Sequence, residues 1–212
     1  MEQQAREQAF ISALTAEHFV LQGARSANVG EMVGRGTIYM GAVSSALIAF
    51  GFLAQVVRRL DPFVAAVLPA LVVLGELTFA ALLRNTMENL LLLERMQRIR
   101  RYYAGLVPEA EEFFDPAEID AQLAAAMATV GLRASPLQLL FTGASVVAAI
   151  NSMLGGAGLA LLAGRLGRLG DGPALLVGVV GTVVVFGLHL VYQQWRTAQL
   201  RPRLQVRGRA AA

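Results

Sequence analysis

Four long apolar segments constrain this chain more strongly than any other feature of its sequence. They cover residues 37–57, 63–83, 137–163 and 174–195, and each is close to the roughly 20 helical residues that cross a bilayer core of about 30 Å. Charged residues make up only 16% of the chain, whereas a soluble domain carries about 25%. The sequence therefore predicts an all-α, polytopic membrane protein with four transmembrane helices.

Short connections predict how these helices are paired. Residues 58–62 join the first two segments, and the glycine-rich residues 165–173 join the last two. Connections of this length place consecutive helices antiparallel, so we expect two transmembrane hairpins. Ser135 followed by Pro136 is typical of a helix N-terminus and predicts that the third helix begins there.

The spans and the segments between them divide the chain into five parts. We expect an interfacial helix at 1–35, a transmembrane hairpin at 36–83, a cytoplasmic helical hairpin at 84–135, a second transmembrane hairpin at 136–195 and an Arg-rich cytoplasmic tail at 196–212.

An amphipathic stripe indicates the interfacial helix. It consists of Phe10, Leu14, His18 and Leu21. These residues recur at helical spacing between charged side chains, and His18 either fills the stripe or senses pH. Gly30, Gly34 and Gly36 follow, and because glycine weakens a helix, they predict a hinge before the first span.

Two helical patterns indicate the cytoplasmic hairpin. The helix of the second span continues to about Gly105, and a second helix starts at the Asp115–Pro116 cap and ends at Gly131, after a turn that follows Pro108. The first helix carries a heptad seam of Leu92, Met96, Ile99, Tyr103 and Leu106. This seam either packs within the chain or drives oligomerisation.

The 18 basic residues are all arginines, and their distribution predicts an orientation. Fourteen lie in the N-terminal part, the central part and the tail, and four lie in the two short connections. Because cytoplasmic loops carry the excess of positive charge, we expect both termini in the cytoplasm and a multi-pass protein of the cell membrane.

The densest arginine cluster comprises Arg95, Arg98, Arg100 and Arg101. These arginines either set the orientation or contact anionic lipids or a protein partner. Arg98 also pairs with Glu94 at helical i,i+4 spacing. No recognition motif accompanies the charge, so nucleic acid is not an expected partner.

Glu76 is the one carboxylate inside a predicted span. A charged group costs about 2.5–3.5 kcal/mol at a helix centre, so Glu76 is the strongest pointer to function. It lies eight residues from Arg84, which is about 12 Å of helix. The other three spans place polar side chains at similar depths: Ser44, Ser45, Ser145 and His189. By the same measure, Asn151 lies too far outward to join them.

This polar set has two interpretations. In the first, Glu76 binds a cation or carries a proton, His189 titrates with it, and the three serines supply oxygen atoms along an ion or proton pathway. In the second, Glu76 pairs with His189 and locks two helices together, which is worth about 1 kcal/mol. Asn151 is expected to form an interhelical hydrogen bond elsewhere.

The third span also carries a ridge of small residues at four-residue spacing. The ridge consists of Ala144, Ala148, Ser152, Gly156, Ala160 and Gly164. Small residues in such rows let two helices approach closely, so we expect this span to be the most tightly packed. Gly178 and Gly181 in the fourth span are its expected partners.

Two stretches of the first half of the chain are distinctive. One is AEHFVLQ at 16–22, which leads through 24–26 into 34–36, and the other is RMQRIRRYY at 95–103. They resemble a loosely defined group of integral membrane proteins of actinobacteria. The resemblance covers about the first half of the chain. It implies a membrane location and a GC-rich source, and it supplies no activity or site residue.

These features support two classes of function. The first is an oligomeric ion channel or transporter-like protein, in which a path forms between protomers because four spans leave little room inside one. The second is a non-catalytic membrane anchor or effector whose cytoplasmic hairpin binds a protein partner. We expect no enzyme, cofactor or metal, because the chain has no cysteine and no paired-carboxylate, metal-ligand or nucleophile motif.

Overall fold

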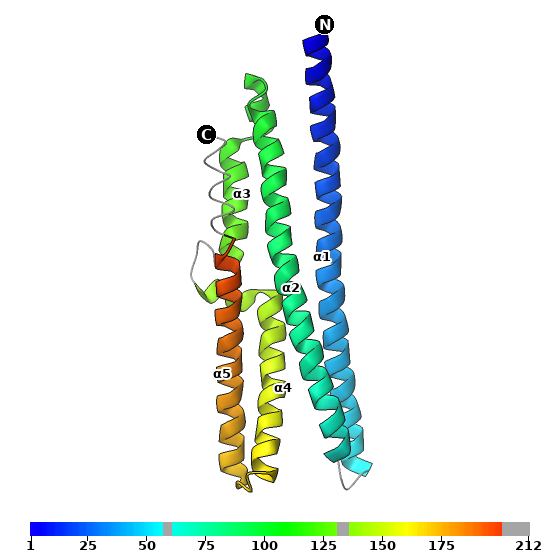
Figure 1. Ribbon diagram of the computed structural model, residues 1–212, viewed down its shortest axis with the longest axis vertical. Helices are drawn as coiled ribbons and strands as arrows, with labels where there is room; N and C mark the ends of the chain where they lie inside the picture. Colours follow the sequence, from blue (N-terminus) through cyan, green and yellow to red (C-terminus); the bar gives the residue numbers. More distant parts are fainter. Residues whose placement is uncertain (57–60, 131–135, 201–212) are drawn as a thin grey trace. The chain divides into compact units, whose positions relative to one another are not determined.

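Helices make up nearly all of the chain that the structure describes. The computed structural model describes residues 1–56, 61–130 and 136–200. Within these ranges there are five α-helices, two short 3-10 helices and no strand (Figure 1). Their bounds are α1 Glu2–Val56, α2 Asp61–Ala104, η1 Pro108–Glu112, α3 Pro116–Thr129, η2 Pro136–Phe141, α4 Gly143–Arg165 and α5 Asp171–Ala198. The predicted all-α fold is confirmed.

Four of these helices, α1, α2, α4 and α5, are long and apolar enough to cross a membrane. They correspond to the four predicted spans and are compatible with an integral membrane protein. The predicted helix stop at Gly131, the Ser135 cap and the tail beyond Leu200 lie outside the described residues.

The chain divides into two compact units. Unit 1 comprises Met1–Glu31, Asn85–Gln138 and Thr197–Ala212, and unit 2 comprises Met32–Arg84 and Leu139–Arg196. α1 and α2 each contribute residues to both units.

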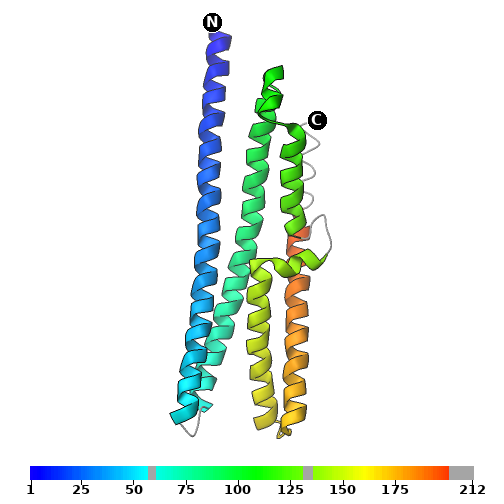
Figure 2. The same cartoon turned by 180° about the vertical axis from the view of Figure 1, so that it is seen from behind.

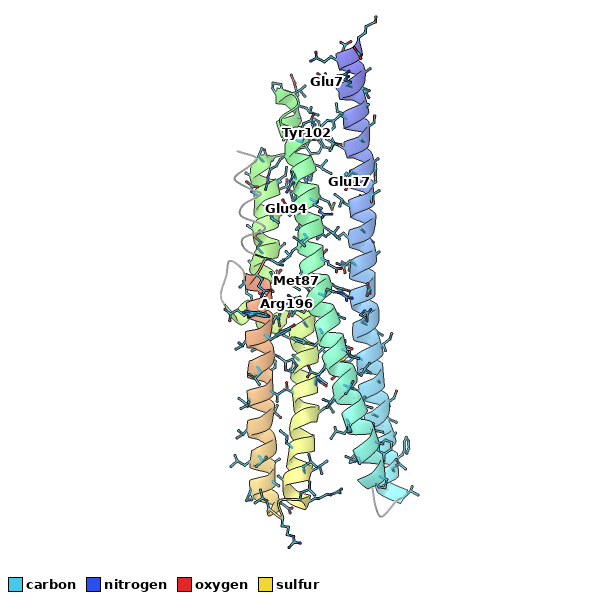
Figure 3. All side chains as sticks on the ribbon, viewed as in Figure 1. Glu7, Glu17, Met87, Glu94, Tyr102 and Arg196 are labelled. Atoms are coloured by element: carbon cyan, nitrogen blue, oxygen red, sulfur yellow. The ribbon has the colours of Figure 1, made fainter. Side chains whose placement is uncertain are left out.

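The N-terminal stripe packs against protein in unit 1. The Thr15 and Tyr103 hydroxyls lie 3.0 Å apart, and the Phe10 and Tyr102 rings meet edge to face at 5.4 Å. Figure 3 shows Tyr102 on the side of α2 that faces α1. Leu21, the last residue of the stripe, is buried. The apolar side of this helix therefore has a protein neighbour.

The predicted hinge before the first span is wrong. α1 is helical without a break from Glu2 to Val56, through Gly30, Gly34 and Gly36. Each glycine costs about 1 kcal/mol relative to alanine in a helix. This cost lowers the stability of the helix without preventing it, since glycine can adopt helical backbone angles.

The two helices predicted for the central part are confirmed. α2 continues to Ala104, and α3 begins at Pro116. The Asp115 carboxylate caps α3 by accepting a hydrogen bond from the Ala117 backbone N–H at 2.8 Å. The segment predicted as a turn after Pro108 is instead the 3-10 helix η1.

The heptad seam of α2 packs largely within unit 1. Ile99 is buried, and Leu92 and Met96 are half-buried. Tyr103 contacts α1 and also lies 5.7 Å from the Phe114 ring. These contacts favour the intramolecular interpretation of the seam.

α4 begins later than the sequence predicts. Residues 136–141 form η2, and the α-helix starts at Gly143. Thr142 is its N-cap, and the Thr142 Oγ1 accepts a hydrogen bond from the Ser145 backbone N–H at 3.2 Å. The prediction that Pro136 opens the helix is wrong, because apolar character continues through residues 137–141 whether or not they are α-helical.

α4 and α5 approach each other closely in unit 2 and lie side by side in both views (Figures 1 and 2). A Cβ atom added at Gly156 would lie 2.5 Å from the Gly178 carbonyl oxygen and would overlap Thr182 Oγ1. A Cβ atom added at Gly178 would lie 2.7 Å from the Ala160 Cβ. Of the remaining ridge, Ala144, Ala148 and Ser152 are buried, and Gly164 is half-buried.

Candidate functional site

Glu76 of α2 and His189 of α5 form a close pair in unit 2. His189 Nε2 lies 3.0 Å from Glu76 Oε1 and 3.2 Å from Oε2. The His189 side chain is 7% exposed, whereas that of Glu76 is 49% exposed. The carboxylate therefore opens to the surface of unit 2, and the imidazole lies buried behind it.

The other ring nitrogen of His189 determines how protons are arranged. His189 Nδ1 lies 2.8 Å from the Val185 carbonyl oxygen. A carbonyl only accepts, so Nδ1 carries a hydrogen and donates it. Nε2 and the carboxylate are then bonded only if one proton lies between them. The pair is either imidazolium with carboxylate or neutral imidazole with a carboxylic acid.

Phe79 holds the imidazole from a second direction. The two rings meet edge to face with their centroids 4.7 Å apart, and Phe79 is buried. The Val185 hydrogen bond and this aromatic contact together orient His189 towards Glu76.

Asn151 and Tyr39 extend the site to the other two long helices. Asn151 Nδ2 donates to Glu76 Oε1 at 2.9 Å, and the Tyr39 hydroxyl donates to Asn151 Oδ1 at 3.5 Å. Both side chains are buried. Gly75 makes room for the Asn151 amide, which a Cβ at that position would overlap. Because Oε1 accepts from Asn151, a proton on the carboxyl group belongs on Oε2.

The expectation that Asn151 lies too far outward is wrong. It assumed that the third helix begins near Pro136, but α4 begins at Gly143. Asn151 is therefore eight residues into its helix, the same count that separates Glu76 from Arg84. The start is seven residues later than expected, which moves every estimated depth on α4 by about 10 Å.

The structure does not bring the three predicted serines to Glu76. Ser44 and Ser45 are exposed on α1. Ser145 is buried in the first turn of α4, where its hydroxyl donates to Gln193 Oε1 at 3.0 Å. Gln193 Nε2 in turn donates to Thr142 Oγ1 at 3.0 Å. These three side chains form a separate polar layer, with Gln193 one turn beyond His189 on α5.

Sequence reasoning therefore missed Tyr39, Gln193 and Thr142, and it excluded Asn151 from the site although it expected the interhelical hydrogen bond that Asn151 forms. One signal was present: His189 and Gln193 are four residues apart and so share a face of α5. Tyr39 carried no such signal, since a tyrosine near a span end is typical of the membrane interface.

The arginine cluster lies in unit 1 and makes mostly protein contacts. Arg101 Nη2 donates to Asp120 Oδ1 at 2.6 Å, and Arg98 pairs with Glu94 as the spacing predicts. Arg100 Nη1 donates to Gln122 Oε1 at 3.0 Å. Arg95 is exposed. The cluster thus helps to join α2 to α3.

In the ranges that the structure describes, no group of three or more His, Asp or Glu side chains could hold a metal ion. Comparison with protein families, curated proteins and solved structures found no match to this chain. The chemistry of the Glu76–His189 pair is therefore the main guide to function.

Proposed function

We propose that this chain is an integral membrane protein of the transporter-like class, with Glu76 as its proton-binding group. One observation carries the proposal. With Nδ1 of His189 committed to the Val185 carbonyl, the contact between Nε2 and the Glu76 carboxylate requires one proton. A buried imidazole and a half-exposed carboxylate that share a proton form a site that can exchange this proton through the exposed carboxylate.

The geometry favours a proton over a metal cation. His189 Nε2 lies within 3.2 Å of both carboxylate oxygens, and Asn151 donates to Oε1. Among the described residues no third carboxylate or imidazole joins the pair to complete a metal site, whereas a proton exchanges within the existing contacts.

The exposure of Glu76 supports a homo-oligomer. The side chain is 49% exposed, and its neighbour Leu77 is 66% exposed. A carboxyl group facing lipid costs several kcal/mol, so a second protomer that covers this face stabilises the assembly. The proton path then runs between protomers.

The distribution of arginines supports a cell-membrane location with both termini in the cytoplasm. A reporter enzyme that is active only outside the cytoplasm, fused after Ala212, is expected to be inactive. Activity of that fusion would reverse the orientation.

Proton flux in proteoliposomes tests the proposed function. We expect wild-type protein to move protons down an imposed potential, read by a pH-sensitive dye inside the vesicles. Glu76→Gln keeps the size of the side chain but cannot exchange a proton, so its rate should fall to that of protein-free vesicles.

Two controls make this test specific. Ser45→Ala changes an exposed polar residue of α1 in unit 2 and should leave the flux unchanged. Asn151→Asp keeps a polar side chain beside Glu76 but replaces its donor, and should slow the flux. Folded wild-type protein that moves no protons at any pH or potential would remove the proposal.

One surface favours the anchor or effector function as the alternative. Where α2 ends, Leu106, Val107 and Phe113 are exposed, Phe113 by 75%. Folded protein without flux, together with cross-linking of an introduced Phe113→Cys to a cytoplasmic protein in cells, would favour this function. The native chain has no cysteine to confuse that experiment.

A further inference from the structure

An apolar pocket opens on unit 2 between α1, α2 and α4. Its volume is about 330 Å³, which is within the range of ligand-binding pockets. Apolar side chains line it, among them Phe50 from α1, Leu68 from α2 and Leu161 from α4. Of the described residues that line it, Arg165 is the only one that carries a charge.

The pocket extends along the helices. On α4 its lining runs from Leu154 to Arg165. These two residues are eleven positions apart, which is roughly 16 Å of helix rise. Half of a bilayer core of about 30 Å is about 15 Å. The pocket therefore has the length of one membrane leaflet.

The charged end lies where a span meets the membrane surface. Arg165 is exposed in the last turn of α4, next to the connection to α5. A guanidinium group has five N–H donors in a planar fork that matches phosphate, enough to bind a phosphate and a protein group together. The pocket therefore has a cationic end and an apolar length, in the same arrangement as the phosphate and the acyl chain of a phospholipid.

We propose that this pocket binds an anionic phospholipid, with an acyl chain between α1, α2 and α4 and its phosphate at Arg165. Charge complementarity at one end and apolar lining along the rest identify this occupant.

One end of the pocket lies about one helical turn from residues of the candidate site. Val43 lies one turn beyond Tyr39 on α1, and Leu154 lies three residues beyond Asn151 on α4. A bound acyl chain therefore packs next to the helical turns that carry Tyr39 and Asn151. Lipid binding is nevertheless measured without flux, so this proposal and the proposed function fail independently.

Fluorescence quenching by brominated lipids tests the site, because Trp195 is the only tryptophan of the chain. In a Trp195→Phe background, Phe50→Trp places the fluorophore in the pocket. The protein is reconstituted in brominated phosphatidylglycerol or brominated phosphatidylcholine. We expect phosphatidylglycerol to bind beside Phe50→Trp about fivefold more strongly, as one arginine near an anionic lipid predicts.

Three further variants make the result specific. Arg165→Gln should lower the preference at Phe50→Trp to about one, and Ala157→Phe, which fills the pocket, should reduce quenching by both lipids. Val179→Trp on the exposed face of α5 should report no preference. Circular dichroism checks that each variant is folded.

The alternative outcomes overturn the proposal. A preference near one at Phe50→Trp, or a preference that Arg165→Gln leaves unchanged, shows that the pocket selects no anionic lipid. If neither lipid quenches Phe50→Trp when Ala157 is unchanged, protein covers the pocket. A measurement of the oligomeric state then shows whether that protein is a second copy of the chain.

Discussion

The two units join their helices by different chemistry. In unit 1, α2 and α3 are linked by the Arg101–Asp120 ion pair, whose side chains are 31% and 66% exposed. In unit 2, α4 and α5 meet through Gly156 and Gly178, so closely that added Cβ atoms would overlap the facing helix. The exposed ion pair is typical of a surface in water, whereas close packing at glycines is typical of helices in lipid, which is as apolar as they are.

Helix capping differs in the same way. In unit 1 the charged Asp115 caps α3, and in unit 2 the neutral Thr142 caps α4. The Thr142 hydroxyl also bonds Ser145 and Gln193, so one neutral group serves several partners. Where water is scarce, polar groups are satisfied by one another.

The largest effect should come from separating α4 from α5. Gly156→Leu forces a side chain into the Gly178 backbone and should lower the free energy of unfolding by about 3 kcal/mol, measured by SDS titration. Gly155→Leu is the matched control, since nothing lies within 4 Å of its Cβ position. Equal losses in both variants would show that α4 and α5 do not pack through this ridge.

A smaller loss is expected from the neutral cap. Thr142→Ala removes the cap of α4 and the acceptor of Gln193, which should cost about 2 kcal/mol of unfolding free energy. Thr142→Ser keeps the hydroxyl and should recover most of the loss. The same SDS titration measures both variants. An unchanged free energy of unfolding in Thr142→Ala would show that the polar layer does not stabilise unit 2.

Disrupting the Glu76–His189 pair should change the free energy of unfolding only slightly, although it should abolish proton flux. A double-mutant cycle with Glu76→Gln and His189→Gln should give a coupling of about 1 kcal/mol in detergent. If coupling is found but neither variant changes proton flux, the pair is only a lock between α2 and α5. No coupling at all would mean that the two side chains do not meet.

The smallest effect should come from the exposed ion pair of unit 1. A cycle with Arg101→Ala and Asp120→Ala should give about 0.5 kcal/mol, and salt should reduce it. The coupling of Glu76 with His189 should respond less to salt, since His189 is buried. Equal salt dependence of both couplings would remove the contrast between the units.

The predictions from sequence were best for long helices and strong caps. Four apolar helices, the end of α2 near Ala104 and the start of α3 after Asp115 follow from periodicity and capping chemistry. The start of α4 and the glycine hinge were wrong. Apolar character does not show where an α-helix begins, and glycine lowers the stability of a helix without necessarily ending it.

The candidate site was predicted in part. Glu76 and His189 were singled out because ionisable groups are rare in spans, and the structure places them together. The depth of Asn151 depended on the start of its helix, and Ser44 and Ser45 share the depth of the site but not its face of α1. Depth follows from counting residues, whereas the face depends on how helices pack.

By itself, the sequence determined the helical fold, the apolar spans and the one carboxylate within them, because these follow from composition and local hydrogen bonding. Only the tertiary structure decided which residues beyond His189 join that carboxylate. Asn151 of α4 meets Glu76, and Tyr39 of α1 meets Asn151, through helix rotation and the close approach at Gly75. Contacts between distant segments arise from packing that no single segment encodes.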